Sequence, residues 1–168
     1  TPNGEQYWEY VLLYTDDVLV ISHKGEHVLR EEINKYFKLK EDSIGPPDIY
    51  LGGQIRKVKL EGNIVAWAFG CSKYVQTAVK NIEKQLSDKD LKLPTGGNTP
   101  LTSGYRPEVD VTPELRPTEA AHYQSLIGIL RWMVELGRID IACEVSMLSS
   151  HLALPRQGHL YQVYHIFS

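Results

Sequence analysis

The chain has 168 residues and a formal net charge of −3 at pH 7, with 42% hydrophobic and 23% charged residues. These values are ordinary for a folded globular protein, and they exclude a collagen-like, low-complexity or wholly disordered chain. The longest uncharged apolar runs are far shorter than the roughly 20 residues that a helix needs to cross a bilayer. The sequence therefore predicts a globular protein with no membrane partner, and its acidic balance is unlike that of an autonomous nucleic-acid binder.

The chain ends indicate whether the sequence is part of a longer protein, and the cysteines indicate its redox compartment. The first residue is Thr1, and His159–Ser168 has a helical pattern with no Gly, Asn or Pro to end it. We expect from this a piece of a longer chain, cut at both ends. Cys71 and Cys143 have no metal-type spacing and are too few for a disulfide framework, so they predict buried, unreactive thiols in a reducing, intracellular compartment.

The pattern of apolar residues over 1–70 predicts mostly strands, with one helix. In chain order the predicted elements are strands Tyr7–Leu13 and Val18–Ser22, a helix over Glu26–Leu39, and strands Ile49–Val58 and Asn63–Phe69. The first two strands are expected to form a hairpin around Tyr14–Asp17, and the last two a second hairpin. Gly52 and Gly53 lie inside the third strand, where glycine often marks a bulge or a close approach to the backbone.

From residue 71 onward the pattern becomes helical. The predicted helices are Lys73–Leu86, Thr118–Leu136, Ile141–Leu154 and one that begins at His159. Ser72, Thr118 and Asp140 are the expected N-caps of the first three helices. A Pro-rich loop over 93–117 separates the first helix from the second and is too rich in proline for a regular element. Strands followed by helices predict an α+β fold.

The most informative residues are Asp16 and Asp17, at the tip of the first predicted hairpin. Two acids on a turn are often only turn formers. Here strongly apolar strands flank them, and seating two carboxylates so close to a core is costly unless a cation neutralises them. Mg²⁺ prefers oxygen ligands, and two such ions can stabilise the attacking and leaving oxygens of phosphoryl transfer. If the strand continued, Tyr14 and Asp16 would share one face and Asp17 the other, so Asp16 is expected to be the leading ligand.

The segment 71–100 is modestly basic, with five lysines and three acids. A solvated helix face and a surface that follows nucleic-acid phosphates explain this equally well, and Lys73 and Lys80 are the candidates for the second. The six histidines show no metal-type clustering and are expected to be structural. The same holds for four large aromatic residues, Trp67, Tyr123, Trp132 and Tyr164.

The Tyr-Thr-Asp-Asp motif at 14–17 is followed by further short motifs at characteristic spacings. They are Tyr50–Gly53, Thr99–Leu101, Tyr123–Leu130, Arg138–Ile141 and the tail from Leu148 to Leu160. Each motif alone is weak evidence. Their order and spacing hold over nearly the whole chain, and together they resemble the reverse transcriptase domain of copia-type retrotransposon polyproteins. Thr15 departs from the family, where a small aliphatic residue is commoner, and Ile139 stands where the family usually has Pro.

The resemblance implies a partial polymerase palm over 1–70 and a helical thumb and connection region over 71–168. Asp16 and Asp17 would be two of three catalytic carboxylates, and ligands of a two-ion site for Mg²⁺ or Mn²⁺. Tyr14 would lie beside the primer terminus. The remaining residues implicated in holding primer and template are Tyr50, Leu51, Gly52 and Gly53, together with Lys73 and Lys80.

In that family the first catalytic Asp and the nucleotide-binding fingers lie upstream, and nothing before Tyr14 can supply them. The two-ion site is therefore expected to be incomplete, and the isolated chain inactive as an RNA-directed DNA polymerase. The implied partners are an RNA template, a DNA primer, deoxynucleoside triphosphates and the rest of a Gag-Pol-like polyprotein, including integrase and ribonuclease H. The implied location is the cytoplasm, in a virus-like particle.

Three interpretations remain open from the sequence. The chain is the downstream half of an RNA-directed DNA polymerase; or a decayed or repurposed remnant that binds nucleic acid or protein without catalysis; or an unrelated α+β domain whose acids are ordinary turn residues. The first two share every visible residue. An intact upstream reading frame with a third Asp would favour the first, and a stop codon or frameshift there would exclude it.

Overall fold

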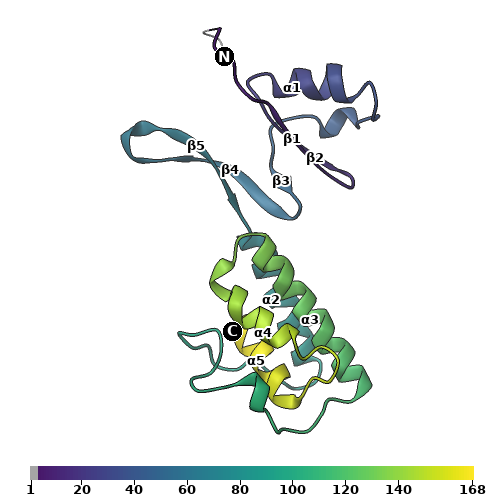
Figure 1. The fold of residues 1–168 in the computed structure, drawn as a ribbon, viewed down its shortest axis with the longest axis vertical. Coiled ribbons are helices and arrows are strands. Elements are labelled where there is room, and N and C mark those ends of the chain that lie inside the picture. Colours follow the sequence, from purple (N-terminus) through teal and green to yellow (C-terminus); the bar gives the residue numbers. More distant parts are fainter. Residues whose placement is uncertain (1–3) are drawn as a thin grey trace. The chain divides into compact units, whose positions relative to one another are not determined.

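The structure is a computed structural model, and it describes residues 4–168. The chain divides into two units, one ending at Phe69 and the other running from Gly70 to Ser168 (Figure 1). The first unit contains the strands, apart from the last residue of β5 (Val65–Gly70), and the second contains the long helices. Within the described residues, no helix is long and apolar enough to cross a membrane.

The first unit begins with a two-stranded antiparallel ribbon. Strand β1 (Tyr10–Tyr14) pairs with β2 (Asp17–Ile21), so the hairpin predicted around the two acids is confirmed. Strand β1 starts later than the predicted Tyr7, because regular pairing begins at Tyr10, opposite Ile21. Strand β2 has the predicted length and starts one residue earlier than predicted.

The first unit also contains a three-stranded sheet, in the order β3-β4-β5. Its strands are β3 (Ile49–Tyr50), β4 (Gly53–Lys59) and β5 (Val65–Gly70). The prediction of one strand over Ile49–Val58 is wrong, because Leu51 and Gly52 reverse the chain and split that segment into β3 and β4. The turn between β4 and β5 lies at Glu61–Asn63, so these two strands form the second hairpin that the sequence predicts.

The helical segment of the first unit is shorter than predicted. Helix α1 (Gly25–His27) continues directly into a π-helical segment, Val28–Ile33, and regular structure does not reach Leu39. The Asn34 side-chain carbonyl accepts a hydrogen bond from the Leu39 N–H at 2.8 Å, which closes a loop in place of further helical turns. Among residues 4–69, only Val28 and Gly53 are buried, so this unit has very little core of its own.

The second unit is a bundle of four α-helices (Figure 1). They are α2 (Ser72–Ser87), α3 (Pro117–Glu135), α4 (Ala142–Ser149) and α5 (Gln157–Phe167). The central helix α3 supplies Tyr123, Leu126, Ile127, Leu130 and Met133 to the core. Side chains from the other three helices complete it: Ala78, Ile82 and Leu86 from α2, Val145 and Leu148 from α4, and Val163 and Phe167 from α5.

The helix starts differ from the predicted N-caps. Ser72 is the first residue of α2, one position past the cap. Helix α3 begins at Pro117, and the Arg116 N–H donates to the Glu119 carboxylate at 3.0 Å, so Thr118 is not the cap. Asp140 forms an ion pair with Arg138 at 2.7 Å and does not cap α4, which follows a 3-10 turn at Ile139–Ile141.

Several further expectations need correction. Helix α4 ends at Ser149 and not at Leu154, because the next three N–H groups, those of Ser150, His151 and Leu152, donate to carbonyls three residues back and so form tighter turns. The loop over 93–117 holds one 3-10 turn, Pro107–Val109, although proline was expected to exclude regular structure. Cys71 is buried as predicted, but Cys143 is exposed. Trp67, which was expected to be structural, is half exposed. The Lys57 ammonium lies over its ring, 5.0 Å from the centroid.

Candidate functional site

The tip of the β1–β2 hairpin carries the two acids that the sequence predicts as metal ligands. Thr15 and Asp16 form its two-residue loop, and Asp17 begins β2 opposite Tyr14. Thr15 has a φ of 47°, a left-handed conformation that is unusual for a β-branched residue. Both acidic side chains are exposed, so the turn presents two adjacent carboxylates to solvent.

The register decides which residues share a face. Directly opposed residues of an antiparallel pair point to the same side, so Tyr14 lies beside Asp17. Tyr14 and Asp16 were expected to share a face only if the strand continued, and it does not, because β1 ends at Tyr14 and Asp16 lies in the turn. Asp17 therefore has the fixed strand position, and Asp16 the loop position.

Asp17 also contacts the second predicted motif. The backbone N–H of Leu51 donates a hydrogen bond to Oδ2 of Asp17, with 3.3 Å between the heavy atoms. Sequence reasoning missed this contact, since it placed Leu51 inside a strand, where its N–H would belong to the sheet. The bond brings the two motifs of the first unit together at one carboxylate.

The Tyr50–Gly53 motif forms a tight turn. Tyr50 pairs with Gly53 across a loop in which Leu51 has a φ of 53° and Gly52 a φ of 82°. Positive φ at both loop positions is the pattern of a type I′ turn, whose twist matches that of the flanking strands. A Cβ on Gly53 would come within 2.1 Å of the Phe69 ring, so the close approach expected at this glycine is made by Phe69.

The donor set at the hairpin tip fits part of a Mg²⁺ site. Carboxylate oxygens are the ligands that this hard cation prefers, and a substrate phosphate usually supplies others. Among the described residues, no group of three or more His, Cys, Asp or Glu side chains gathers closely enough to hold a metal ion. Asp16 and Asp17 therefore form a pair of candidate ligands.

The two candidate lysines lie on one exposed face of α2. Lys73 and Lys80 are seven residues apart, which is about two helical turns and about 10 Å along the axis. Lys84 continues this face, and all three are exposed. The buried face of the helix, with Ile82 at its centre, lies on the opposite side. The lysines are thus free to meet a ligand, and a role in holding nucleic acid remains a prediction.

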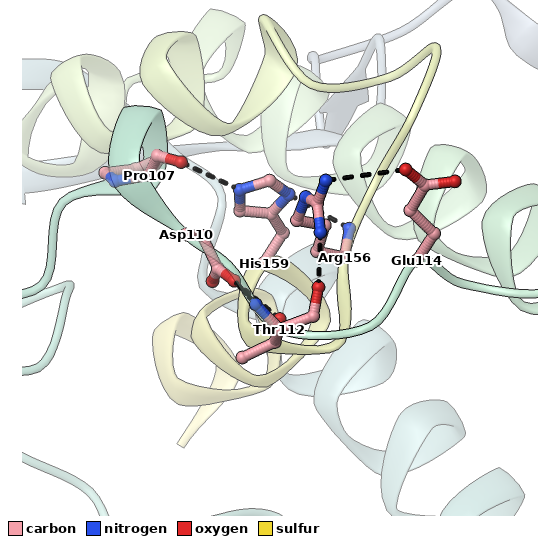
Figure 2. Close-up of polar contacts among 6 residues, drawn as sticks. All are labelled: Pro107, Asp110, Thr112, Glu114, Arg156 and His159. Atoms are coloured by element: carbon pink, nitrogen blue, oxygen red, sulfur yellow. Dashed lines mark hydrogen bonds and ion pairs between the residues drawn. The ribbon is translucent and has the colours of Figure 1, made fainter.

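A polar cluster in the helical unit was not among the predicted site residues (Figure 2). The Asp110 carboxylate accepts hydrogen bonds from the Thr112 N–H at 2.8 Å, from the Thr112 hydroxyl at 2.5 Å, and from the Tyr105 hydroxyl. Burial opposes the charge of Asp110, but the bonds from Thr112 and Tyr105 outweigh it and hold the pKa of Asp110 below its usual value. Burial and the bond to Asp110 raise the pKa of Tyr105. The spacing Asp110-Val111-Thr112 is the one sequence signal for this cluster, since it favours an Asx turn.

The chain is similar to a curated protein of Saccharomyces cerevisiae named "Putative transposon Ty5-1 protein". The two are 30% identical over 154 residues, which make up 90% of this chain and 45% of the yeast protein. This chain thus spans less than half the length of the relative that it matches. No protein-family model matches the sequence, and no solved structure matches it significantly. The similarity supports a transposon-related protein.

Proposed function

We propose that the chain is part of the reverse transcriptase of a copia-type retrotransposon, comprising the second half of the palm and the thumb and connection region. The observation that carries this proposal is the pair of adjacent carboxylates, Asp16 and Asp17, at the tip of a tight antiparallel hairpin. Similarity to a transposon protein over nearly the whole chain supports the transposon origin that this proposal requires.

In this proposal Asp16 and Asp17 each supply carboxylate oxygens to a two-ion Mg²⁺ site. When bound, the ions would stabilise the attacking and leaving oxygens of nucleotidyl transfer. The Leu51 N–H holds one Asp17 oxygen, so Asp17 would bind through the other. Tyr14, beside Asp17, and the Tyr50–Gly53 turn would contact the end of the DNA primer.

The surface of the hairpin supports a larger palm. All five side chains of β1 are exposed, from 40% for Leu12 to 58% for Leu13, although every one is apolar or aromatic. A strand whose apolar side chains are exposed on both faces is typical of a surface that packs against another segment or protein. The covering segment in this proposal is the upstream palm, which would also carry the third catalytic carboxylate.

The helical unit would act as the thumb. Lys73 and Lys80 lie on the exposed face of α2, about 10 Å apart along the helix axis, and their ammonium groups can pair with nucleic-acid phosphates. The substrates would be an RNA template, a DNA primer and deoxynucleoside triphosphates, and the rest of a Gag-Pol-like polyprotein would complete the enzyme, in a cytoplasmic virus-like particle.

Metal binding can be tested on the chain itself, with Mn²⁺ as a paramagnetic probe for Mg²⁺. We expect Mn²⁺ to broaden the amide resonances of Tyr14–Asp17 first, and weakly, because only two ligands are in place. Asp16→Asn should remove this selective broadening. Asp42→Asn, which removes another exposed acid of the same unit, should leave it unchanged.

Equal broadening at Asp42 and at the hairpin tip would contradict the proposed metal site. The same chain should not extend a primed RNA template in Mg²⁺, because the third carboxylate and the nucleotide-binding fingers are absent. Template-dependent extension by the isolated chain would show that the assignment of missing parts is wrong.

A further inference from the structure

The first turn of α5 is completed by a distant loop, residues 105–115, which we call the latch loop (Figure 2). The Gly158 N–H donates to the Thr112 hydroxyl oxygen at 2.9 Å, and the Gln157 N–H donates to the Pro113 carbonyl at 3.0 Å. The first N–H groups of a helix have no partner within the helix. The latch loop supplies two of these partners, so the loop and the start of α5 stabilise each other.

The Arg156 side chain binds the same loop through two further contacts. Its Nη1 donates to the Thr112 carbonyl at 2.6 Å, and its Nη2 lies 3.4 Å from Glu114 Oε1. The Leu115 N–H donates to the Pro155 carbonyl at 2.9 Å, next to the isolated bridge between Glu114 and Arg156. Docking of the latch loop is thus concentrated on residues just before and within the first turn of α5.

His159 closes this turn from within the helix. Its Nδ1 accepts the Arg156 N–H at 3.0 Å, and its Nε2 lies 3.0 Å from the Pro107 carbonyl of the latch loop. Glu or Gln commonly occupies this helix position and reaches back to the N-cap N–H. Here an imidazole does so, and only 2% of His159 is exposed. Because Nδ1 faces a donor and Nε2 faces an acceptor, the partners assign the proton to Nε2.

This arrangement requires a neutral imidazole. A proton added to Nδ1 would point at the Arg156 N–H, so the cap would be lost and two donors would face each other in a buried place. Histidine is the side chain whose ordinary titration falls between about pH 5 and 8. We propose that His159 is a proton-sensitive latch: its neutral form fastens the latch loop to α5, and its protonation releases the loop.

The charged and titratable groups around His159 come from every neighbouring element. Those that act on His159 directly are Asp110 of the latch loop, Tyr123 of α3, His151 after α4, and Arg156 at the start of α5. Behind them, Tyr105 bonds to Asp110, Glu108 acts on His151, and Glu114 lies beside Arg156.

The two rings beside His159, those of His151 and Tyr123, are held toward their neutral forms. The His151 ring lies 4.2 Å from that of His159, and burial together with His159 lowers the pKa of His151. Burial raises the pKa of Tyr123, so this neighbour stays neutral. Asp110 would attract a charged His159, but its oxygens already accept from Thr112 and Tyr105, and this carboxylate belongs to the loop being released.

Amide hydrogen exchange on the whole chain tests the latch. At about pH 5.5 relative to about pH 7.5, after correction for intrinsic rates, we expect protection of the Arg156, Gly158 and Leu115 amides to fall. The expected fall is about three- to tenfold, the equivalent of one hydrogen bond. His159→Gln is the matched control, because Gln keeps an acceptor for the Arg156 N–H without titrating in this range. In this variant the protection of the same three amides should change less than about twofold between the two pH values.

An equal loss of protection in wild type and in His159→Gln would overturn the proposal, and so would unchanged protection in wild type. If His159→Gln does not fold, the ring ¹⁵N resonances of His159 in the wild-type chain decide. Protonation of Nδ1 over the same pH interval as the amide opening supports the latch. A ring that becomes protonated while the loop stays protected contradicts it, as does a loop that opens while the ring stays neutral.

Discussion

The backbone N–H of Leu51 donates a hydrogen bond to Oδ2 of Asp17, across 3.3 Å and 34 positions of sequence. This bond joins the type I′ turn after β3 to the tip of the first hairpin. A backbone donor is held by the turn itself, so it can fix the orientation of a carboxylate without a second side chain. Asp17 is thereby oriented by the motif that is proposed to hold the primer.

Removing the acceptor should release the Leu51 amide. In Asp17→Ala we expect the exchange protection of this amide to fall about three- to tenfold, the range expected for one hydrogen bond. Asp16→Ala is the matched control, since Asp16 lies in the loop, and it should leave Leu51 unchanged. Equal protection of Leu51 in wild type and Asp17→Ala would show that the contact does not persist in solution.

The contact between Gly53 and Phe69 should appear as energetic coupling. Gly53→Ala places a methyl group within 2.1 Å of the present position of the Phe69 ring, so the half-exposed ring must move. We expect a loss of about 1–2 kcal/mol in the free energy of unfolding of the first unit. In a Phe69→Ala background the same substitution should cost much less. Urea unfolding of the four proteins measures this double-mutant cycle. Additive losses of stability would contradict the assigned contact.

The local features of the fold were largely predictable, because they depend on short-range chemistry. Apolar strands around Tyr14–Asp17 predicted the hairpin, and the helical pattern over Thr118–Leu136 predicted α3 to within one residue at either end. Gly52 illustrates where this reasoning fails. A glycine between apolar residues fits a strand and a turn alike, and only pairing between Tyr50 and Gly53 decides.

Long-range polar contacts were not predictable from the sequence. Thr112 and Gly158 are 46 positions apart, and no local pattern indicates that a threonine hydroxyl completes a distant helix. His159 could have been recognised only as a histidine at a capping position, and this requires the helix start to be known. The metal role of Asp16 rests on its chemistry and on family resemblance, and it stays a prediction.

The stability of the helical unit should depend on the charge of Asp110. Its pKa is depressed in the folded chain, so the unfolded chain binds a proton more readily. The contribution is fully present above the ordinary carboxyl value of about 4 and is lost as the pH falls through the lower folded value. Urea unfolding at a series of pH values should show this fall in stability at low pH, which we call the acid limb. Asp110→Asn should flatten the acid limb and lower the free energy of unfolding by about 1–2 kcal/mol at neutral pH.

Asp88→Asn serves as the control, since it removes an exposed acid from the end of α2. It should leave both the acid limb and the stability at neutral pH nearly unchanged. An acid limb of the same slope in Asp110→Asn and in wild type would exclude Asp110 as its source.

Phosphate contacts by α2 should appear in the salt dependence of nucleic-acid binding. Each lysine that neutralises a phosphate contributes about one unit to the slope of log K against log salt. Lys73→Ala combined with Lys80→Ala should therefore lower the slope for a primed RNA template by about two. Lys35→Ala, in the first unit, should not change it. Fluorescence anisotropy measures the slope, and equal slopes in the double variant and wild type would exclude these contacts.

Asp16 and Asp17 are proposed to bind the catalytic metal of a reverse transcriptase. The most direct test of this role is primer extension on an RNA template in Mg²⁺, by a longer protein that carries this chain together with its upstream palm. Asp16→Asn should abolish extension at unchanged expression, because a carboxylate ligand is lost, whereas Asp42→Asn should leave it intact. DNA synthesis retained by Asp16→Asn would contradict the claim.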